Sequence, residues 1–358
     1  MKTALQYALK VGADDAAAPI RVMLVDDSAV VRSIFARILS ANANLKLIFE
    51  AADGEAAINA LDHIQPDIIL LDIEMPHRSG LDVLPELLLK GKGARVLVVS
   101  ALAEENGPAA VRALALGACD TLAKPGRVGF AGTFAQTLVE KVTRLGRASE
   151  VVATDSALPK VITDVELVRP SCIAIGSSTG GIPAINTIIG RLDPGLDCPI
   201  FITQHLPPAF MAFFAKQLQS LTSRVVTVAC AGMPVRKNHI YVAPGEAHLV
   251  CARAGGKIVL DCPEKYPSSH YCPSVDAMFA SIASIYGGKA LSIVLSGMGN
   301  DGSIGAAALR QSNAAIIVQD SHSSVVWGMP GSVARQGIAN AILDQDQIAR
   351  FLEFVARR

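Results

Sequence analysis

Short hydrophobic stretches alternate with amphipathic stretches of helical period along most of this 358-residue chain. In the N-terminal part, strands are expected at 21–25, 45–49, 67–71, 94–99 and 119–122, with helical patterns between them and after the last. Strands that alternate with helices form parallel sheets, because each crossover lays a helix on one face of the sheet. Residues 20–146 are therefore predicted to form a (βα)5 α/β domain with a parallel sheet.

A second alternating block follows a polar stretch at 147–169, which we interpret as a linker. Its expected strands are 171–175, 199–203, 291–295 and 314–318, and its expected helices are 182–192, 209–221, 275–286 and 304–311. Between 224 and 261 the pattern changes to short strands with glycine turns, which predicts a small antiparallel excursion. Residues 170–358 are thus predicted to be a doubly wound α/β domain, and residues 1–19 a disordered leader.

The composition excludes several classes of partner. Lys and Arg balance Asp and Glu at 32 each, so no polyanion-binding surface and no nucleic acid partner are expected. The seven cysteines form no CxxC pair, which is typical of reduced thiols in the cytoplasm. No run of 18 apolar residues occurs, so no membrane insertion is expected. We expect a cytoplasmic monomer.

Polar side chains follow the strands of the first block, where sites form in open parallel sheets. Asp26 and Asp27 follow the first strand, Asp72 the third, Ser100 the fourth and Lys124 the fifth. Three carboxylates in one crevice repel each other unless a cation lies among them, and oxygen ligands suit Mg²⁺. A carboxylate beside Mg²⁺ can attack a phosphoryl group, whose oxygens a hydroxyl and an ammonium can then contact.

This arrangement resembles the response-regulator receiver domain. The resemblance rests on four motifs: Val25-Asp26-Asp27-Ser28, Leu71-Asp72-Ile73-Glu74-Met75-Pro76, Val99-Ser100-Ala101 and Ala123-Lys124-Pro125. It implies that a histidine kinase phosphorylates Asp72, that Asp26, Asp27 and Asp72 hold Mg²⁺ together with the main-chain carbonyl of Glu74, and that Ser100 and Lys124 form the switch. It also implies a cis Lys124–Pro125 bond. His77-Arg78-Ser79 departs from the family, which usually has an acidic residue before the glycine.

In the second block, a serine turn, a histidine and an aspartate each follow a strand. The turn Gly176-Ser177-Ser178-Thr179-Gly180-Gly181 precedes a helix, where free N–H groups favour either a nucleophilic serine or a bound phosphate. His205 and Asp301 are the candidate base and orienting acid, because a hydroxyl needs a base whose tautomer a third group fixes. The chain order Ser, His, Asp is no objection, since a triad is defined by geometry.

A dinucleotide site is the main alternative interpretation of the second block. Gly297-x-Gly299-x-x-Gly302 follows a strand and opens a helix, and Asp320 ends the next strand. However, such a fingerprint normally opens the first βαβ unit of its domain, whereas this one comes late. A Walker P-loop is excluded because no Gly-Lys-Ser/Thr follows Gly176.

The second block resembles the catalytic domain of the chemotaxis protein-glutamate methylesterases. The resemblance rests on the serine turn, on Gln204-His205-Leu206-Pro207-Pro208, on Pro273-Ser274-Val275-Asp276, on Gly297-Met298-Gly299-Asn300-Asp301-Gly302 and on Trp327-Gly328-Met329-Pro330. It implies that Ser178 is the nucleophile, because the family usually has alanine where Ser177 stands. His205 is then the base, Asp301 its orienting acid and the Met298 amide a candidate oxyanion donor. Tyr271-Cys272 replace a usual His-Arg pair.

The resemblance implies a phosphorylation-activated enzyme. It would hydrolyse glutamate γ-methyl esters on methyl-accepting chemoreceptors, release methanol and deamidate selected receptor glutamines, with no cofactor for the ester reaction. The unphosphorylated receiver is expected to lie over the active-site face. A non-catalytic phospho-switch is a further alternative, but it would require a broken triad, and all three residues are present.

Overall fold

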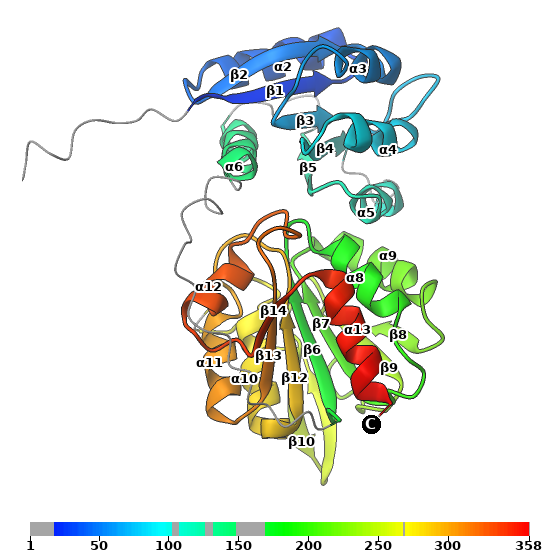
Figure 1. Ribbon diagram of the computed structural model, residues 1–358, viewed down its shortest axis with the longest axis vertical. Helices are drawn as coiled ribbons and strands as arrows, with labels where there is room; N and C mark the ends of the chain where they lie inside the picture. The colour runs from blue at the N-terminus through cyan, green and yellow to red at the C-terminus, as the bar shows by residue number, and fades with distance from the viewer. Residues whose placement is uncertain (1–17, 102–106, 126–131, 148–168, 268, 358) are drawn as a thin grey trace, which may run out of the picture.

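The computed structural model describes residues 18–101, 107–125, 132–147, 169–267 and 269–357. Two parallel sheets, each covered by helices on both faces, form an N-terminal and a C-terminal unit (Figure 1). The predicted α/β class and the order of the two sheets along the chain are confirmed. The predicted leader, apart from residues 18 and 19, and nearly all of the predicted linker lie outside the described residues.

The N-terminal sheet has the order β2-β1-β3-β4-β5, and every neighbouring pair is parallel. Its strands are β1 (Ile20–Val25), β2 (Leu45–Ala51), β3 (Ile68–Leu71), β4 (Arg95–Ala101) and β5 (Asp120–Lys124). One apolar core joins this sheet to α2 (Ala29–Ser40) and α6 (Thr133–Arg147). The core on the other face joins it to α3 (Gly54–Ala60), α4 (Gly80–Lys90) and α5 (Gly107–Ala115).

The C-terminal sheet has the order β14-β13-β12-β6-β7-β9-β8 and is likewise parallel throughout. Its strands are β6 (Cys172–Ser177), β7 (Ile200–Gln204), β8 (Val225–Val228), β9 (His239–Val242), β12 (Ala290–Val294), β13 (Ala315–Gln319) and β14 (Ala341–Leu343). After β6, the chain places β7, β8 and β9 on one side of that strand. It then crosses over and places β12, β13 and β14 on the other side. This change of direction makes the carboxyl ends of β6 and β12 the expected ligand site of the sheet.

Helices cover both faces of the C-terminal sheet. One face packs against α8 (Ile182–Gly190), α9 (Pro208–Gln219) and α13 (Gln345–Ala356). The other packs against α10 (Val275–Tyr286), α11 (Ser303–Gln311) and α12 (Met329–Arg335), and the 3₁₀ turn Gly287–Lys289 leads into β12. The hairpin of β10 (Val250–Ala254) and β11 (Lys257–Asp261) adds apolar side chains to this second core.

The antiparallel excursion is smaller than the sequence pattern indicated. Among the described strands only β10 and β11 pair antiparallel, with one isolated antiparallel bridge from Pro234 to Val259 of β11, whereas β8 and β9 extend the main parallel sheet from β7. The fully buried Ile240 and Val242 explain this placement, because they complete the core beneath α8 and α9. Strand β14 and helices α12 and α13 had no counterpart among the expected elements.

One expectation about a proline bond is contradicted by the structure. The cis bond expected before Pro125 is wrong: the only cis peptide among the described residues precedes Pro273. The trans form of an X–Pro bond is favoured by only about 0.5–1 kcal/mol, so local surroundings rather than the sequence decide the isomer.

All seven cysteines are free thiols. Within the described part of the chain, every helix is too short or too polar to cross a bilayer.

Candidate active site and phosphoacceptor site

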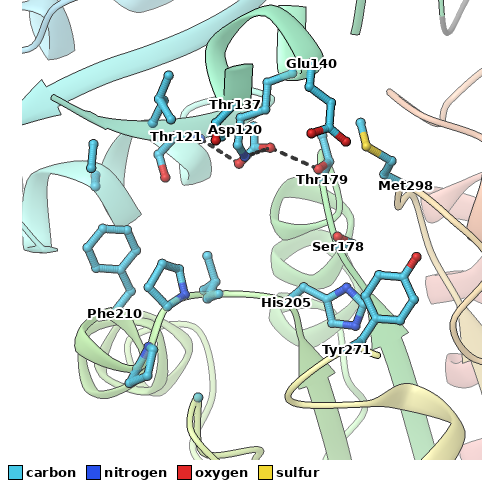
Figure 2. Close-up of a pocket in the computed structure, with 18 of the residues that line it drawn as sticks. Asp120, Thr121, Thr137, Glu140, Ser178, Thr179, His205, Phe210, Tyr271 and Met298 are labelled. Atoms are coloured by element: carbon cyan, nitrogen blue, oxygen red, sulfur yellow. Dashed lines mark hydrogen bonds and ion pairs between the residues drawn. The ribbon is translucent and has the colours of Figure 1, made fainter. Parts of the chain in front are cut away.

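The serine, histidine and aspartate loops of the second block meet at the carboxyl ends of three adjacent strands. Ser178 follows β6, His205 follows β7 and Asp301 lies in the loop after β12, and β6 pairs with both other strands. Ser178 and His205 both line one cavity (Figure 2). The sequence therefore predicted correctly that these three loops share one edge of the sheet.

The two serine hydroxyls of the turn are buried to different extents. The Ser177 side chain is fully buried, and its hydroxyl donates to the Ser296 carbonyl over 3.4 Å. Ser178 is half-buried and faces the cavity, while its amide donates to the same carbonyl at 3.0 Å. Gly180 has a φ of +75°, and a Cβ there would lie 2.3 Å from Val325, so the turn requires glycine. The geometry favours Ser178 over Ser177 as a nucleophile.

The imidazole of His205 is bonded to a buried carboxylate. Its Nε2 lies 2.8 Å from Asp301 Oδ2. If Nε2 carries the proton, it donates to this carboxylate and leaves Nδ1 as an acceptor for a serine hydroxyl. Among the described residues, no protein group is hydrogen-bonded to Nδ1. The carboxylate thus holds the ring by one nitrogen and leaves the other available to accept a proton, which a general base requires.

Asp301 is held by donors at the start of α10. Its Oδ1 accepts from the Ser274 hydroxyl at 2.9 Å and from the Asp276 and Gly302 amides at 3.0 Å, and its Oδ2 accepts from the Val275 amide at 2.7 Å. Burial by itself would raise the pKa of Asp301, but the His205 ring and these amides lower it below its ordinary value. The carboxylate is therefore charged and fixed in place.

Sequence reasoning did not find this support for Asp301. Ser274 is the N-cap of α10 and is completely buried. Its position before an apolar helical run was a visible capping signal, but nothing in the sequence showed that the free amides of α10 face Asp301. Burial raises the pKa of the adjacent Asp276 to about 6, and the Asp301 charge adds to this. Asp276 accepts from the Gly305 amide at 2.7 Å, away from His205.

The replaced pair at 271–272 lies directly at the site. The Tyr271 ring stacks on the His205 ring with a centroid distance of 5.0 Å and an interplanar angle of 9° (Figure 2). A Cβ on Gly299 would lie 2.1 Å from the Tyr271 hydroxyl oxygen, so this glycine admits the tyrosine. Cys272 is exposed and also lines the cavity.

The glycine-rich loop after β12 packs against the serine turn. A Cβ on Gly297 would lie 2.9 Å from the Cβ of Ser178, so this glycine lets the loop approach the serine turn. Met298 lines the cavity, and its amide donates to no group in the described residues. Asp320, the expected ribose ligand, accepts from the Ser323 amide and hydroxyl at 2.8 and 2.7 Å. The dinucleotide interpretation is left without structural support.

The N-terminal unit brings its acidic residues together at the carboxyl ends of β1 and β3. Carboxylate oxygens of Asp26, Asp27 and Asp72 lie within 4.8 Å of one another. Lys124 Nζ lies 2.7 Å from Asp26 and 2.6 Å from Asp72. Burial raises the pKa of Asp72 to about 6, although the Lys124 ammonium opposes this. Three clustered carboxylates with one cation leave excess negative charge, and this donor set fits Mg²⁺.

The remaining predicted residues of the first block surround this cluster. The Glu74 amide donates to Asp72 Oδ1 at 3.3 Å, which places Glu74 beside the acceptor. Ser100 is buried at the end of β4, where it pairs in register with Ala123. In the loop that departs from the receiver pattern, Arg78 forms ion pairs with Glu55 and Glu86, so its charge is directed away from Asp72.

The raised pKa of Asp72 predicts a pH-dependent penalty on stability. Below about pH 4 the carboxyl is protonated in both the folded and the unfolded chain, and the penalty is absent. As pH rises from about 4 to 6, only the unfolded chain releases this proton freely, so folding loses up to about 3 kcal/mol. Asp72→Asn removes the ionisation. The variant should therefore be more stable than wild type at pH 7, with a gap that narrows towards pH 4.

Urea unfolding of the full chain in EDTA, between pH 4.5 and 7.5, measures this gap. Asp27→Asn is the matched control, since Asp27 belongs to the same cluster but is exposed. A gap that widened towards low pH, or a less stable Asp72→Asn variant at pH 7, would contradict the assignment of burial as the cause.

The two units contact each other across the serine turn. The Gly180 amide donates to the Cys119 carbonyl at 2.9 Å, and the Thr179 hydroxyl donates to Asp120 at 3.2 Å (Figure 2). Arg144 of α6 lies 3.3 Å from the Met298 sulfur. Apolar side chains of α5 share one core with α8 and α9, and α6 packs against the loop at 325–326 (Figure 1).

A cavity of about 530 Å³ remains between the units at this contact. Its lining from the C-terminal unit includes Ser178, His205, Tyr271 and Met298. Its lining from the N-terminal unit comes from β4, β5, α5 and α6: Ser100, Ala110, Asp120, Thr121, Leu122, Ala123, Thr137, Glu140, Lys141 and Arg144. The N-terminal unit thus forms a wall of the cavity that holds the serine and the histidine.

Family models match both parts of the chain. Residues 173–352 match the CheB methylesterase family, and residues 22–129 match the response regulator receiver domain. The chain is 40% identical to protein-glutamate methylesterase/protein-glutamine glutaminase 2 of Caulobacter vibrioides, over 94% of this chain and 99% of that protein. It is 38% identical to the corresponding protein 1 of Rhodospirillum rubrum, over 93% and 94%.

A solved structure is similar to the C-terminal unit. The CheB methylesterase catalytic domain of Thermotoga maritima covers 52% of this chain with its full length, at 33% identity and a TM-score of 0.50.

Proposed function

Since the chain belongs to the CheB methylesterase family and carries a receiver domain, we propose that it removes methyl groups from receptor proteins. Its substrates are glutamate γ-methyl esters on methyl-accepting chemotaxis receptors, and its product is methanol. The same site deamidates selected receptor glutamines, because an amide passes through a similar tetrahedral intermediate. The observation that carries the proposal is the His205–Asp301 pair at 2.8 Å, together with the cavity that His205 and Ser178 both line.

The proposed reaction proceeds in two steps through an acyl-enzyme. The Ser178 hydroxyl attacks the ester carbonyl while His205 Nδ1 accepts its proton, and Asp301 stabilises the imidazolium. The Met298 amide would donate to the oxyanion, and the place of Met298 in the cavity lining supports this role. His205 then returns the proton to the leaving methoxide, and methanol departs. Water, deprotonated by His205, cleaves the acyl-enzyme and restores the serine.

We propose that Asp72 of the receiver accepts a phosphoryl group from a chemotaxis histidine kinase. The cluster of Asp26, Asp27 and Asp72 would hold Mg²⁺, together with the Glu74 carbonyl. When bound, the ion neutralises charge on the transferred phosphoryl group. Lys124 contacts Asp72 already and would pair with a phosphoryl oxygen, and Ser100 would donate its hydroxyl as the switch. The ester reaction itself needs no cofactor.

The proposed regulation is that the unphosphorylated receiver excludes receptors from the serine turn. The contacts of Cys119 and Asp120 with Gly180 and Thr179 support it, because they lie directly beside Ser178. Phosphorylation would shift the population towards a state in which these contacts are released. Ser100 supports the connection between the two sites. It lies near the carboxyl end of β4, at the same edge of the sheet as Asp72, and it also lines the cavity.

We further propose residues 20–146 and 170–358 as the two domains, joined by 147–169. Each contains a complete sheet whose cores lie within it, apart from the contacts of α5 and α6 described above. The protein is proposed to act as a cytoplasmic monomer that meets its receptors at the membrane surface without inserting and that binds no nucleic acid.

Methanol release from membranes with methyl-labelled receptors tests the proposal. The full chain should release methanol slowly, and Mg²⁺ with acetyl phosphate should raise the rate by about 5–150-fold, which corresponds to a bias of about 1–3 kcal/mol. Asp72→Asn should keep the slow rate with or without acetyl phosphate, and the fragment 170–358 should approach the stimulated rate. Absence of methanol from every form would refute the esterase assignment, whereas a fragment slower than the full chain would refute only the covering role.

A further inference from the structure

The covered active site is still open to small molecules. Although the receiver domain lies against the serine turn, a cavity of about 530 Å³ remains around Ser178 and His205. Its lining includes exposed residues, among them Glu140, Cys272 and Tyr271, which is 36% exposed, so it reaches the surface. Cavities of about 300–1,000 Å³ are the usual size of small-ligand sites.

The receiver leaves the reacting groups untouched. Its hydrogen bonds end on Thr179, on the Gly180 amide and on the Met298 sulfur, and none of these is the nucleophile or the base. In the described part of the chain, no receiver group is bonded to the Ser178 hydroxyl or to the His205 ring. The His205–Asp301 distance of 2.8 Å is that of a working base and its orienting acid. The covered state therefore restricts access without dismantling the site.

The size of the cavity divides substrates into two groups. Even the thinnest folded substrate, a single α-helix with its side chains, is about 10 Å wide. To reach Ser178, such a helix would have to displace the part of the cavity wall that β5 and α6 form, so we expect the cavity to exclude a folded protein. A single capped amino acid ester is small enough to enter.

The charges of the cavity favour an uncharged ligand. Lys141 is paired with Asp120 at 2.5 Å, and Arg144 is paired with Glu140 on the next turn of α6. Each cation on the receiver wall thus already has a carboxylate partner, so the wall offers no unpaired positive charge to an anionic ligand. A methyl ester carries no charge and needs only the oxyanion donor and the nucleophile.

We propose a second activity: the unphosphorylated, covered enzyme hydrolyses small uncharged carboxylic esters within the interdomain cavity, although it excludes receptors. The inference rests on the proposed function, because it uses the same serine. Ser178 forms an acyl bond as the ester C–O bond breaks and the alcohol takes the proton from His205. Water then releases the carboxylic acid. Phosphorylation consequently controls which substrates enter, and not the chemistry.

The test compares two substrates on the full chain. The small substrate is glutamate γ-methyl ester with acetyl and methylamide caps, and the large one is methylated receptor in membranes. Without phosphodonor, kcat/KM for the capped ester should lie within about twofold of its value with Mg²⁺ and acetyl phosphate, since both states are competent for it. Receptor hydrolysis, by contrast, should rise with phosphorylation.

A plugging variant shows whether the cavity is the route. Thr137 of α6 is half-buried and lines the cavity, whereas Thr133, one turn earlier, is exposed outside it. Thr137→Trp should lower unphosphorylated hydrolysis of the capped ester by tenfold or more, since misplacement by about 1 Å already costs up to 10²-fold. Thr133→Trp should leave it unchanged. Receptor hydrolysis by both unphosphorylated variants should stay slow, which shows that the domains remain together.

Each alternative result is decisive. If phosphorylation raises capped-ester hydrolysis as much as receptor hydrolysis, or if receptors are hydrolysed and the capped ester never is, the small-ester activity is refuted while the methylesterase function stands. Unchanged capped-ester hydrolysis by Thr137→Trp, with receptor hydrolysis still slow, also refutes the cavity route. If the capped ester is hydrolysed equally in both states but receptors never are, the receptor function is refuted and the cavity activity stands.

Discussion

Ser178→Ala should lower ester hydrolysis by about 10⁴-fold or more, because the acyl-enzyme cannot form without the hydroxyl. The side chain is half-buried and its backbone bonds do not involve Oγ, so folding should be unaffected. The measurement is kcat for methanol release from methylated receptors in the presence of acetyl phosphate, together with the urea midpoint of the variant.

Ser177→Ala is the matched control for the nucleophile. This neighbouring hydroxyl is fully buried and donates to the Ser296 carbonyl over a long 3.4 Å, so its removal should leave most of the activity. An inactive Ser177→Ala enzyme beside an active Ser178→Ala enzyme would reverse the assignment.

Asp301→Asn should give the second largest loss, about 10⁴-fold, the cost of the corresponding change in a serine protease. The carboxylate accepts five hydrogen bonds, from His205, Ser274 and three amides. An asparagine must turn its NH2 group towards some of these donors. If NH2 faces His205, the ring takes the tautomer with a proton on Nδ1 and can no longer accept from Ser178.

The same change also affects stability. An NH2 group placed against buried N–H donors leaves polar groups unsatisfied, so the variant should lose about 1–3 kcal/mol in urea unfolding. Asp276→Asn is the control, because Asp276 contacts the Gly305 amide and not the histidine. Near wild-type turnover by Asp301→Asn, or a larger loss by Asp276→Asn, would show that another acid orients the base.

The sequence placed Ser178, His205 and Asp301 directly after strands, and the structure brings their loops together because parallel strands end at one edge of a sheet. The same rule brought Asp26, Asp27 and Asp72 together around Lys124. These predictions succeed where hydrophobic periodicity defines a strand and a polar residue follows it directly.

The features that the sequence did not reveal depend on contacts between distant segments. The bonds from the start of α10 to Asp301 and the stacking of Tyr271 on His205 join residues about 25 to 66 positions apart, as their numbers show. Strands β8 and β9 were expected in the antiparallel excursion, because a short strand has the same sequence pattern in a hairpin and at the edge of a parallel sheet. The Lys124–Pro125 bond is trans because of its local surroundings, which the sequence motif does not reveal.

The bond from the Gly180 amide to the Cys119 carbonyl has an evolutionary consequence. Neither atom belongs to a side chain, so a substitution at Cys119 leaves its carbonyl in place, whereas Gly180 must remain glycine for the reason given above. Substitutions that accumulate at Asp120 or Thr179 can weaken the contact between the domains in small steps, while the backbone bond keeps the two domains in the same alignment. Relatives that diverge in these side chains should therefore retain the same docking register, and inheritance of the covered state should tolerate considerable sequence change.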